Sequence, residues 1–124
     1  MRSKEKKTAQ TLMKLGNSPK SKGFHDLCVG LKFIMSDPRS VTNLSKILYP
    51  KIAEKFQATA IGVERSVRSS IQTGWHRRDI ELAKEMFGNT LQSDNDIPSN
   101  ALYISAVAEW LKWDSDDDQS TNSG

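Results

Sequence analysis

The side chains best suited to recognising another molecule gather between Leu48 and Arg78 of this 124-residue chain. Two helical segments are expected there, separated by the short sequence 57–59, and Ala53 supplies the small residue needed where such helices cross. Apolar residues of the second segment recur every four positions, at Val63, Val67 and Ile71. At about 100° per residue, this repeat turns five polar side chains to the opposite face or its flanks: Glu64, Arg65, Arg68, Ser69 and Gln72.

These outward side chains carry groups that can read DNA bases. An arginine guanidinium can bind O6 and N7 of guanine, and a carboxylate can accept a hydrogen bond from the amino group of cytosine. Phosphates repel a carboxylate, so Glu64 is expected on such a helix only as a base reader. The residues placed to hold phosphates are Lys51, Lys55, Thr59, Arg77 and Arg78. The pattern predicts a helix-turn-helix whose second helix enters the major groove.

The same pattern also fits a plain helical hairpin. Glu64 and Arg68 are four residues apart, so they can form an ion pair on a solvated helix, which contributes about 0.2–0.5 kcal/mol. The turn between the two segments has no glycine at its centre. The residue pattern alone therefore leaves the helix-turn-helix and the hairpin open.

Apolar residues at three- and four-residue spacing predict further helices on both sides of this segment. Three helices are predicted before it. The first is short, has Ala9, Leu12, Met13 and Leu15 facing inward, and ends at Gly16. The second spans Phe24–Met35 and ends at Asp37-Pro38, and the third spans Val41–Leu48 and is capped by Ser40 or Thr42. Pro50 precedes Lys51–Phe56, and Thr59 caps Ala60–Trp75. Two helices are predicted after it. The first is capped by Asp79, ends at Gly88 and has Ile80, Leu82 or Ala83, Met86 and Phe87 on its apolar side. The second is capped by Ser99 and spans Leu102–Leu111. Asn89–Asn100 is expected to be a loop. The predicted fold is an all-α bundle of about six helices.

Composition and residue types exclude several functional classes. The chain is 36% hydrophobic and 27% charged, and no apolar run approaches the roughly 20 residues of a membrane span. A single cysteine, Cys28, rules out an internal disulfide framework and fits a reducing compartment, so a cytoplasmic protein away from membranes is expected. His25 beside Asp26 is interpreted as a surface pair, and one cysteine with two distant histidines cannot form a structural zinc site. Without a catalytic triad or a phosphate loop, we expect no enzyme activity, no cofactor and no metal.

The net charge of +3 is distributed unevenly along the chain. Residues 1–38 carry +5, residues 39–78 carry +6 and residues 79–124 carry −8. A basic centre beside an acidic C-terminal third favours an anionic partner such as nucleic acid, and a solvated surface with uneven charge remains the alternative.

A longer string of residues resembles a known family. The string is Leu48-Tyr49-Pro50-Lys51-Ile52-Ala53-Glu54-Lys55-Phe56, then Thr59-Ala60, Val63-Glu64-Arg65-Ser66-Val67-Arg68, Ile71 and Trp75. It is similar to the DNA-binding effector domain of stage zero sporulation protein A, a response regulator of sporulation. Further matches are Leu15-Gly16, Lys22-Gly23-Phe24, Ser40-Val41-Thr42, Phe87-Gly88 and Pro98-Ser99-Asn100, so the resemblance covers roughly residues 8–113.

The resemblance implies an all-helical domain that binds double-stranded DNA at a short promoter box similar to TGTCGAA. It assigns base reading to Glu64, Arg65 and Arg68, and contacts with the DNA backbone to Thr59, Ser66 and the flanking basic residues. Ser69 stands where the sporulation regulator has a histidine, so we place it among the base readers and expect a different sequence preference. Gln72 is placed among the backbone contacts.

Two protein partners are also implied. Family members bind tandem boxes as homodimers and contact the housekeeping sigma factor of RNA polymerase. The sigma contact uses the helix after the recognition helix, here about Ile80–Leu91. Glu81, Lys84 and Glu85 replace smaller polar residues there, which puts this contact in doubt.

The expected organisation has three parts. Residues 1–7 form a basic arm, residues 8–113 form the DNA-binding domain, and residues 114–124, without a hydrophobic residue, form a disordered acidic tail. We expect the chain to lack the receiver domain of a full-length regulator, either as a stand-alone protein or as an excised domain. Two functions stay open: a sequence-specific transcription regulator, or an interaction module that modulates a full-length sporulation regulator or the sigma factor. In the interaction module, the acidic tail, which carries a net charge of −4, either folds back on the basic face or stays solvated.

Overall fold

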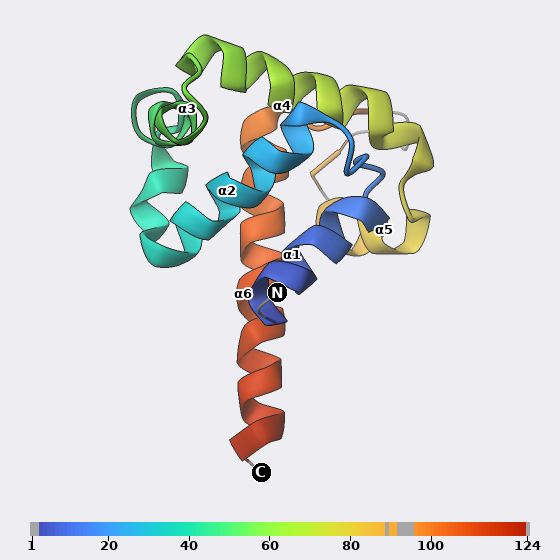
Figure 1. Ribbon diagram of the computed structural model, residues 1–124. Coiled ribbons are helices and arrows are strands. Elements are labelled where there is room, and N and C mark those ends of the chain that lie inside the picture. Colours follow the sequence, from blue (N-terminus) through green and yellow to red (C-terminus); the bar gives the residue numbers. More distant parts are fainter. Residues whose placement is uncertain (1–2, 89, 92–95, 124) are drawn as a thin grey trace.

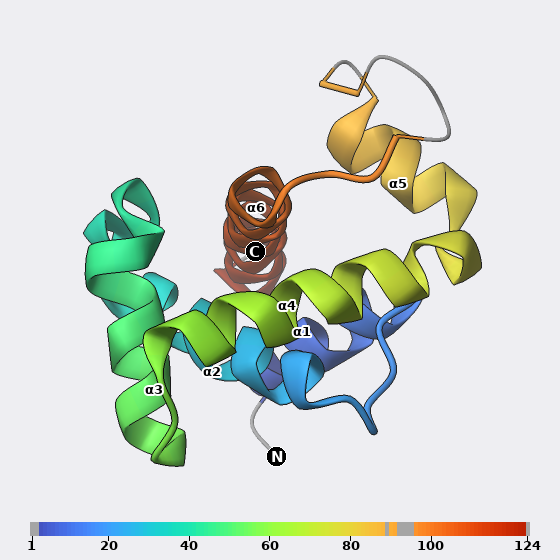
Figure 2. The same cartoon turned by 90° about the horizontal axis from the view of Figure 1, so that it is seen from above.

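The computed structural model describes residues 3–88, 90–91 and 96–123, without the side chains of residues 114–123. All regular elements in these ranges are helical, which confirms the all-α prediction. The α-helices are α1 (Ser3–Lys14), α2 (Lys22–Ser36), α3 (Tyr49–Phe56), α4 (Ala60–Gly74), α5 (Ile80–Phe87) and α6 (Asn100–Ser123). Short helical turns form at η1 (Pro38–Thr42), η2 (Leu44–Leu48) and η3 (Trp75–Arg77). Helix α4 lies across the bundle, with α3 at one of its ends and α5 near the other (Figures 1 and 2).

Helix α1 ends at a glycine in the left-handed region, as predicted. Gly16 has a φ of +98°, and its N–H donates to the carbonyl of Met13 at 3.0 Å. The next N–H, of Asn17, reaches back to the carbonyl of Leu12 at 3.0 Å, which completes a Schellman motif. Met13 was predicted to face inward, and the structure corrects this: it is 44% exposed. The core covers only one side of α1, and Thr11 is buried on that side instead.

The basic N-terminal residues are part of α1 rather than a separate arm. Helix α1 begins at Ser3, and the carboxylate of Glu5 in its first turn lies 3.4 Å from Nζ of Lys32 on α2. A carboxylate in the first turn also stabilises a helix through its dipole. The first two residues of the predicted arm lie outside the described residues.

Helix α2 follows the predicted span closely. The hydroxyl of Ser21 accepts from the N–H of Phe24 at 3.1 Å at its start, and the helix ends before Asp37. The prediction of a surface pair is wrong for Asp26, which is fully buried and pairs with Nζ of Lys22 at 2.9 Å. Neighbouring helical residues point about 100° apart, so exposed His25 and buried Asp26 face different surroundings.

Between α2 and α3 the chain forms two short turns instead of one helix capped by Ser40 or Thr42. The Asp37 carboxylate accepts from the N–H of Arg39 at 3.2 Å and caps η1, with Pro38 in its first position. Asn43 caps η2 in the same way, accepting from the N–H of Lys46 at 3.1 Å. Because the two turns begin at Pro38 and Leu44, Asp37 and Asn43 stand at their capping positions, whereas Ser40 and Thr42 lie inside η1 and cannot cap it.

The turn between α3 and α4 is also a Schellman motif, built without glycine. Gln57 adopts the left-handed region with a φ of 53°, and the N–H of Ala58 donates to the carbonyl of Ala53 at 2.8 Å. Thr59 then caps α4, as predicted, by accepting from the N–H of Gly62 at 3.0 Å. A tight helix–turn–helix therefore forms although glycine is absent from its centre.

Replacing Gln57 by glycine is expected to stabilise the fold by about 0.5–1 kcal/mol. A side chain in the left-handed region costs about 1–2 kcal/mol, and the extra freedom of an unfolded glycine offsets about half of that gain. Urea unfolding followed by circular dichroism measures the change. Gln57→Ala is the control, because it keeps the Cβ and should give no gain; equal shifts for both variants would contradict the strain argument.

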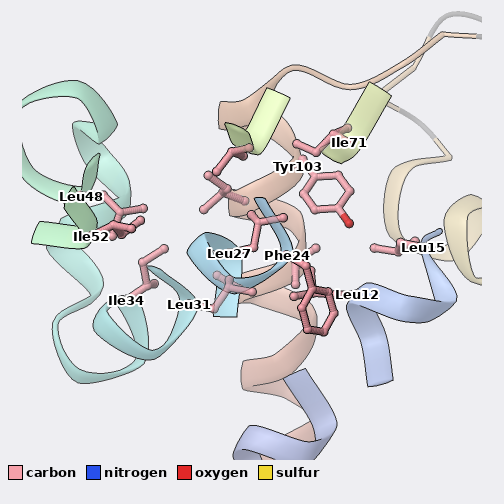
Figure 3. Packing of buried hydrophobic residues seen from close by; sticks show 14 of the residues in the cluster. Leu12, Leu15, Phe24, Leu27, Leu31, Ile34, Leu48, Ile52, Ile71 and Tyr103 are labelled. Atoms are coloured by element: carbon pink, nitrogen blue, oxygen red, sulfur yellow. The ribbon is translucent and has the colours of Figure 1, made fainter. Parts of the chain in front are cut away.

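The core lies where α2, α4 and α6 meet, and Figure 3 shows its side chains. The ring of Tyr103 on α6 packs against both Trp75 and Phe87, with ring centroids 6.4 and 6.0 Å away, and those two rings lie 5.5 Å from each other. Helix α5 joins this cluster through Ala83 and Phe87. Ile80 was predicted on the apolar side of α5, but it is 47% exposed, because the core covers this short helix only along its inner edge.

Helix α6 carries the chain away from α4. It is capped at Ser99, as predicted, and its first turn contacts α4, whereas its C-terminal end projects beyond the body (Figure 1). The backbone stays helical to Ser123, which differs from the predicted disorder of residues 114–124; no proline or glycine interrupts the helix before Gly124. Among the described residues, no helix combines the length and the apolar character that a bilayer crossing requires.

Candidate nucleic-acid interface

Helix α4 presents one polar face to solvent. Its apolar repeat is buried against the rest of the bundle, with Val63, Val67 and Ile71 at most 2% exposed. On the opposite face the side chains of Arg65, Arg68, Ser69 and Gln72 are all exposed, and Glu64 is half-buried at the flank. The structure therefore brings the base readers that the sequence predicts together on one side of one helix.

The two arginines of this face differ in their surroundings. The Arg68 guanidinium donates to the carboxylate of Glu64, which is the ion pair expected for a spacing of four residues. Both side chains stay partly exposed, and opening such a pair costs only about 0.2–0.5 kcal/mol. Among the residues that the structure describes, Arg65 has no hydrogen-bond or ion-pair partner. Arg65 can therefore bind an external acceptor without breaking an internal bond.

Asn100 holds the recognition helix against its neighbours. Its Nδ2 donates to the backbone carbonyl of Glu64 on α4 at 3.1 Å and to the hydroxyl of Tyr49 on α3 at 3.2 Å. Tyr49 is buried, and burial raises the pKa of its phenol, so the hydroxyl stays protonated. Helices α3, α4 and α6 thus meet at one amide. Its position within the Pro98-Ser99-Asn100 match is the only signal for this role in the sequence.

A second amide, the buried side chain of Asn17, fixes the far half of α4. The Oδ1 atom of Asn17 accepts from the hydroxyl of Ser70 on α4 at 2.7 Å. Its Nδ2 donates to the carbonyl of Leu12 at 3.2 Å and to the hydroxyl of Tyr103 on α6. Ser70 also lies 3.0 Å from the hydroxyl of Ser21, at the start of α2. These bonds orient α4 between the end of α1 and the middle of the bundle.

The residues predicted to contact phosphates fall into two groups. Lys51, Lys55 and Thr59 are exposed on α3 and at the turn that leads into α4, and Lys55 shares a groove with residues of α2. Lys22 of α2, which the sequence interpretation missed, lies at the same end of α3 with Nζ 5.9 Å from the centre of the Phe56 ring, although it is also paired with Asp26. Basic side chains therefore gather on α3 and at the start of α2, near the turn before α4.

The second group has partners within the fold. Arg77 donates to the carbonyl of Gly16 at 2.9 Å, and the Arg78 guanidinium lies 4.9 Å from the Trp75 ring centre. Arg78 also donates to the carbonyl of Trp75 at 2.9 Å. Ser66 is half-buried on the α2 side of α4 rather than on its outward face. These three side chains serve the packing of α4 whether or not they also touch DNA.

Groups capable of other chemistry are sparse. Burial raises the pKa of the Cys28 thiol to about 11, so the thiol stays protonated at neutral pH and is a poor nucleophile. Within the described residues, no group of three or more His, Cys, Asp or Glu side chains is arranged to hold a metal ion.

The family assignment agrees with this geometry. Residues 8–111 match the family described as the sporulation initiation factor Spo0A C terminal. The chain belongs to this family. Spo0A C-terminal domains are all-α DNA-binding domains of sporulation regulators, and the family is one of transcription factors rather than of enzymes. The helix-turn-helix interpretation of α3 and α4 is thus favoured over the plain hairpin, and double-stranded DNA is the partner that family membership supports.

Proposed function

We propose that this Spo0A-type domain reads a short promoter box through the major groove, with α4 as the recognition helix. The observation that carries the proposal is the outward face of α4, where exposed arginine, serine and glutamine side chains lie opposite a fully buried apolar stripe. An α-helix with such a face fits the major groove, and its side chains can reach base edges.

Each group on this face has a distinct task in the proposal. Arg65 binds O6 and N7 of a guanine, and Glu64 releases Arg68 to a second guanine while its own carboxylate accepts from cytosine. Ser69 donates to or accepts from a further base. Lys51, Lys55, Thr59 and Gln72 hold phosphates, with Ser66 assisting from the middle of the helix and Arg77 and Arg78 from beyond its C-terminal end.

Fluorescence anisotropy with two DNA duplexes tests the proposal. One duplex carries two TGTCGAA-like boxes, and the other has the same composition in scrambled order. Tight binding to the boxes alone, with affinity that falls as salt rises, supports a sequence-reading regulator. Equal affinity for both duplexes would contradict base reading.

Arg65→Ala is expected to weaken box binding by about 1–3 kcal/mol, or roughly fivefold to 150-fold, while the scrambled duplex is bound almost as before. The effect arises because alanine cannot make the bidentate contact with guanine. Lys55→Ala is the matched control, since removing a phosphate-binding charge should weaken both duplexes alike and lower the salt slope by about one. Equal weakening of the two duplexes by Arg65→Ala would show that this side chain does not read a base.

Two protein partners are part of the proposal, a second copy of the chain and the sigma factor. Homodimers on tandem boxes would place two α4 helices in successive major grooves. The sigma contact, if retained, would use the exposed side of α5, where Ile80, Glu81, Lys84 and Glu85 face solvent. Loss of sigma binding on charge reversal at Lys84, with box affinity unchanged, would support this second role; intact binding would count against it.

The geometry argues against the acidic C-terminal segment folding back on the recognition face. Asp114 lies fourteen residue steps beyond Asn100 on α6, a distance of about 21 Å at 1.5 Å per residue. The helix runs away from α4 over this length (Figure 1). At physiological salt, charges are screened beyond about 8 Å, so the segment acts as a separate acidic extension.

A further inference from the structure

The recognition face contains one large apolar side chain that the fold does not use. Ile61 is 64% exposed, the highest value among the exposed large hydrophobic residues that the structure describes. It is the second residue of α4, directly after the cap at Thr59 and the first helical residue Ala60. The buried stripe of α4 begins only at Val63, so Ile61 contributes little to the core.

The position of Ile61 on the helix sets it among the base readers. It precedes Arg65 by four residues and Arg68 by seven, and these spacings place the three side chains on one face. The N-terminal residues of a recognition helix are the ones that contact base edges. An apolar side chain cannot hydrogen-bond to a base edge, so any base contact that Ile61 makes from this position is an apolar one.

Double-stranded DNA offers one such partner in the major groove. Thymine alone carries a methyl group there, at C5, and apolar side chains read it by contact. A β-branched side chain in a helix is held in essentially one rotamer, so Ile61 is already ordered before it meets the base. Covering it removes apolar surface from water at little entropic cost.

We propose that Ile61 reads a thymine by packing against its 5-methyl group, next to the guanine bound by Arg65. This contact rests on the proposed function, since it requires α4 to lie in the major groove. The contact would make Ile61 a determinant of sequence specificity, although its side chain forms no hydrogen bond with a base.

Deoxyuridine scanning tests the contact directly. Each thymine of the box, on both strands, is replaced in turn by deoxyuridine, which removes only the methyl group. At one position the unmodified protein is expected to bind about threefold to tenfold more weakly. Ile61→Ala should bind the thymine and deoxyuridine duplexes equally, because the alanine side chain is too short to reach the methyl group. Met13→Ala, which removes an exposed apolar side chain on α1, should keep the full deoxyuridine penalty.

The outcomes separate the two proposals. A deoxyuridine penalty that vanishes only in Ile61→Ala establishes the contact. The same penalty in both proteins, or no penalty at any thymine while the box is still preferred over the scrambled duplex, overturns the role of Ile61 and leaves the proposed function intact. No preference for the box in the unmodified protein overturns both. Because Ile61 is exposed, its alanine variant should unfold at the same urea concentration as the unmodified protein, which excludes a folding defect.

Discussion

Gly23→Ala is expected to destabilise the fold by about 3 kcal/mol and to displace the recognition helix. A Cβ at Gly23 would lie 2.2 Å from the backbone carbonyl oxygen of Ser66 and 2.5 Å from Cβ of Ser70. The nearest atom belongs to the backbone of α4, so no rotation of a side chain relieves the overlap. Helices α2 and α4 would have to separate at the point where they cross most closely.

Gly30→Ala on the same helix is the matched control. Its Cβ would meet Cδ1 of Ile52 at 2.9 Å, the far end of a flexible side chain that can turn away. Alanine also improves helix propensity by about 1 kcal/mol over glycine in a helix interior, so the net change should lie within about 1 kcal/mol of zero. Equal urea midpoints for the two variants would show that the crossing of α2 and α4 tolerates a side chain.

The effect of Gly23→Ala should extend to DNA. Ser66 lies next to Arg65 on α4, and a shift of its backbone moves the outward face as well. At a temperature where the variant is still folded, we expect its affinity to fall more for the box than for the scrambled duplex. Unchanged box affinity in a destabilised variant would mean that α4 keeps its place and α2 yields instead.

Local patterns were enough to predict the helices that carry complete apolar repeats. The spans of α2 and α4 and the caps at Thr59, Asp79 and Ser99 agree with the structure, because each depends on residues within one or two turns. Periodicity failed for Met13 and Ile80, where a helix touches the core along a narrow line and the edge of its stripe remains in water.

Contacts between segments that are far apart in the chain could not be predicted from the sequence. Asn17 and Tyr103 are 86 residues apart, and Asn100 lies 51 residues from Tyr49, so no local spacing predicts either bond. The outward face of α4 was predictable because it is the complement of a local apolar repeat. Arg77 was assigned to phosphates from its charge alone, whereas its guanidinium reaches the carbonyl of Gly16, 61 residues away.

Asn17→Leu is expected to lower the free energy of unfolding by about 2–3 kcal/mol. The leucine side chain fills a similar volume but leaves the hydroxyl of Tyr103 without its partner inside the protein, whereas Ser70 loses one of its two partners and keeps the hydroxyl of Ser21. Each buried polar group left unsatisfied costs about 1–3 kcal/mol. For a domain of this size, the melting temperature should fall by roughly 5–20 °C, as followed by circular dichroism.

A double-mutant cycle with Tyr103→Phe separates this cost from a general packing defect. Phenylalanine keeps the ring packed against Trp75 and Phe87 but removes the hydroxyl that Asn17→Leu would leave without a partner. Replacing both partners of a buried hydrogen bond by apolar groups can be nearly neutral, so Asn17→Leu should cost about 1–2 kcal/mol less in the Tyr103→Phe background than alone. Strictly additive effects would show that the amide contributes through its shape rather than through its bond to Tyr103.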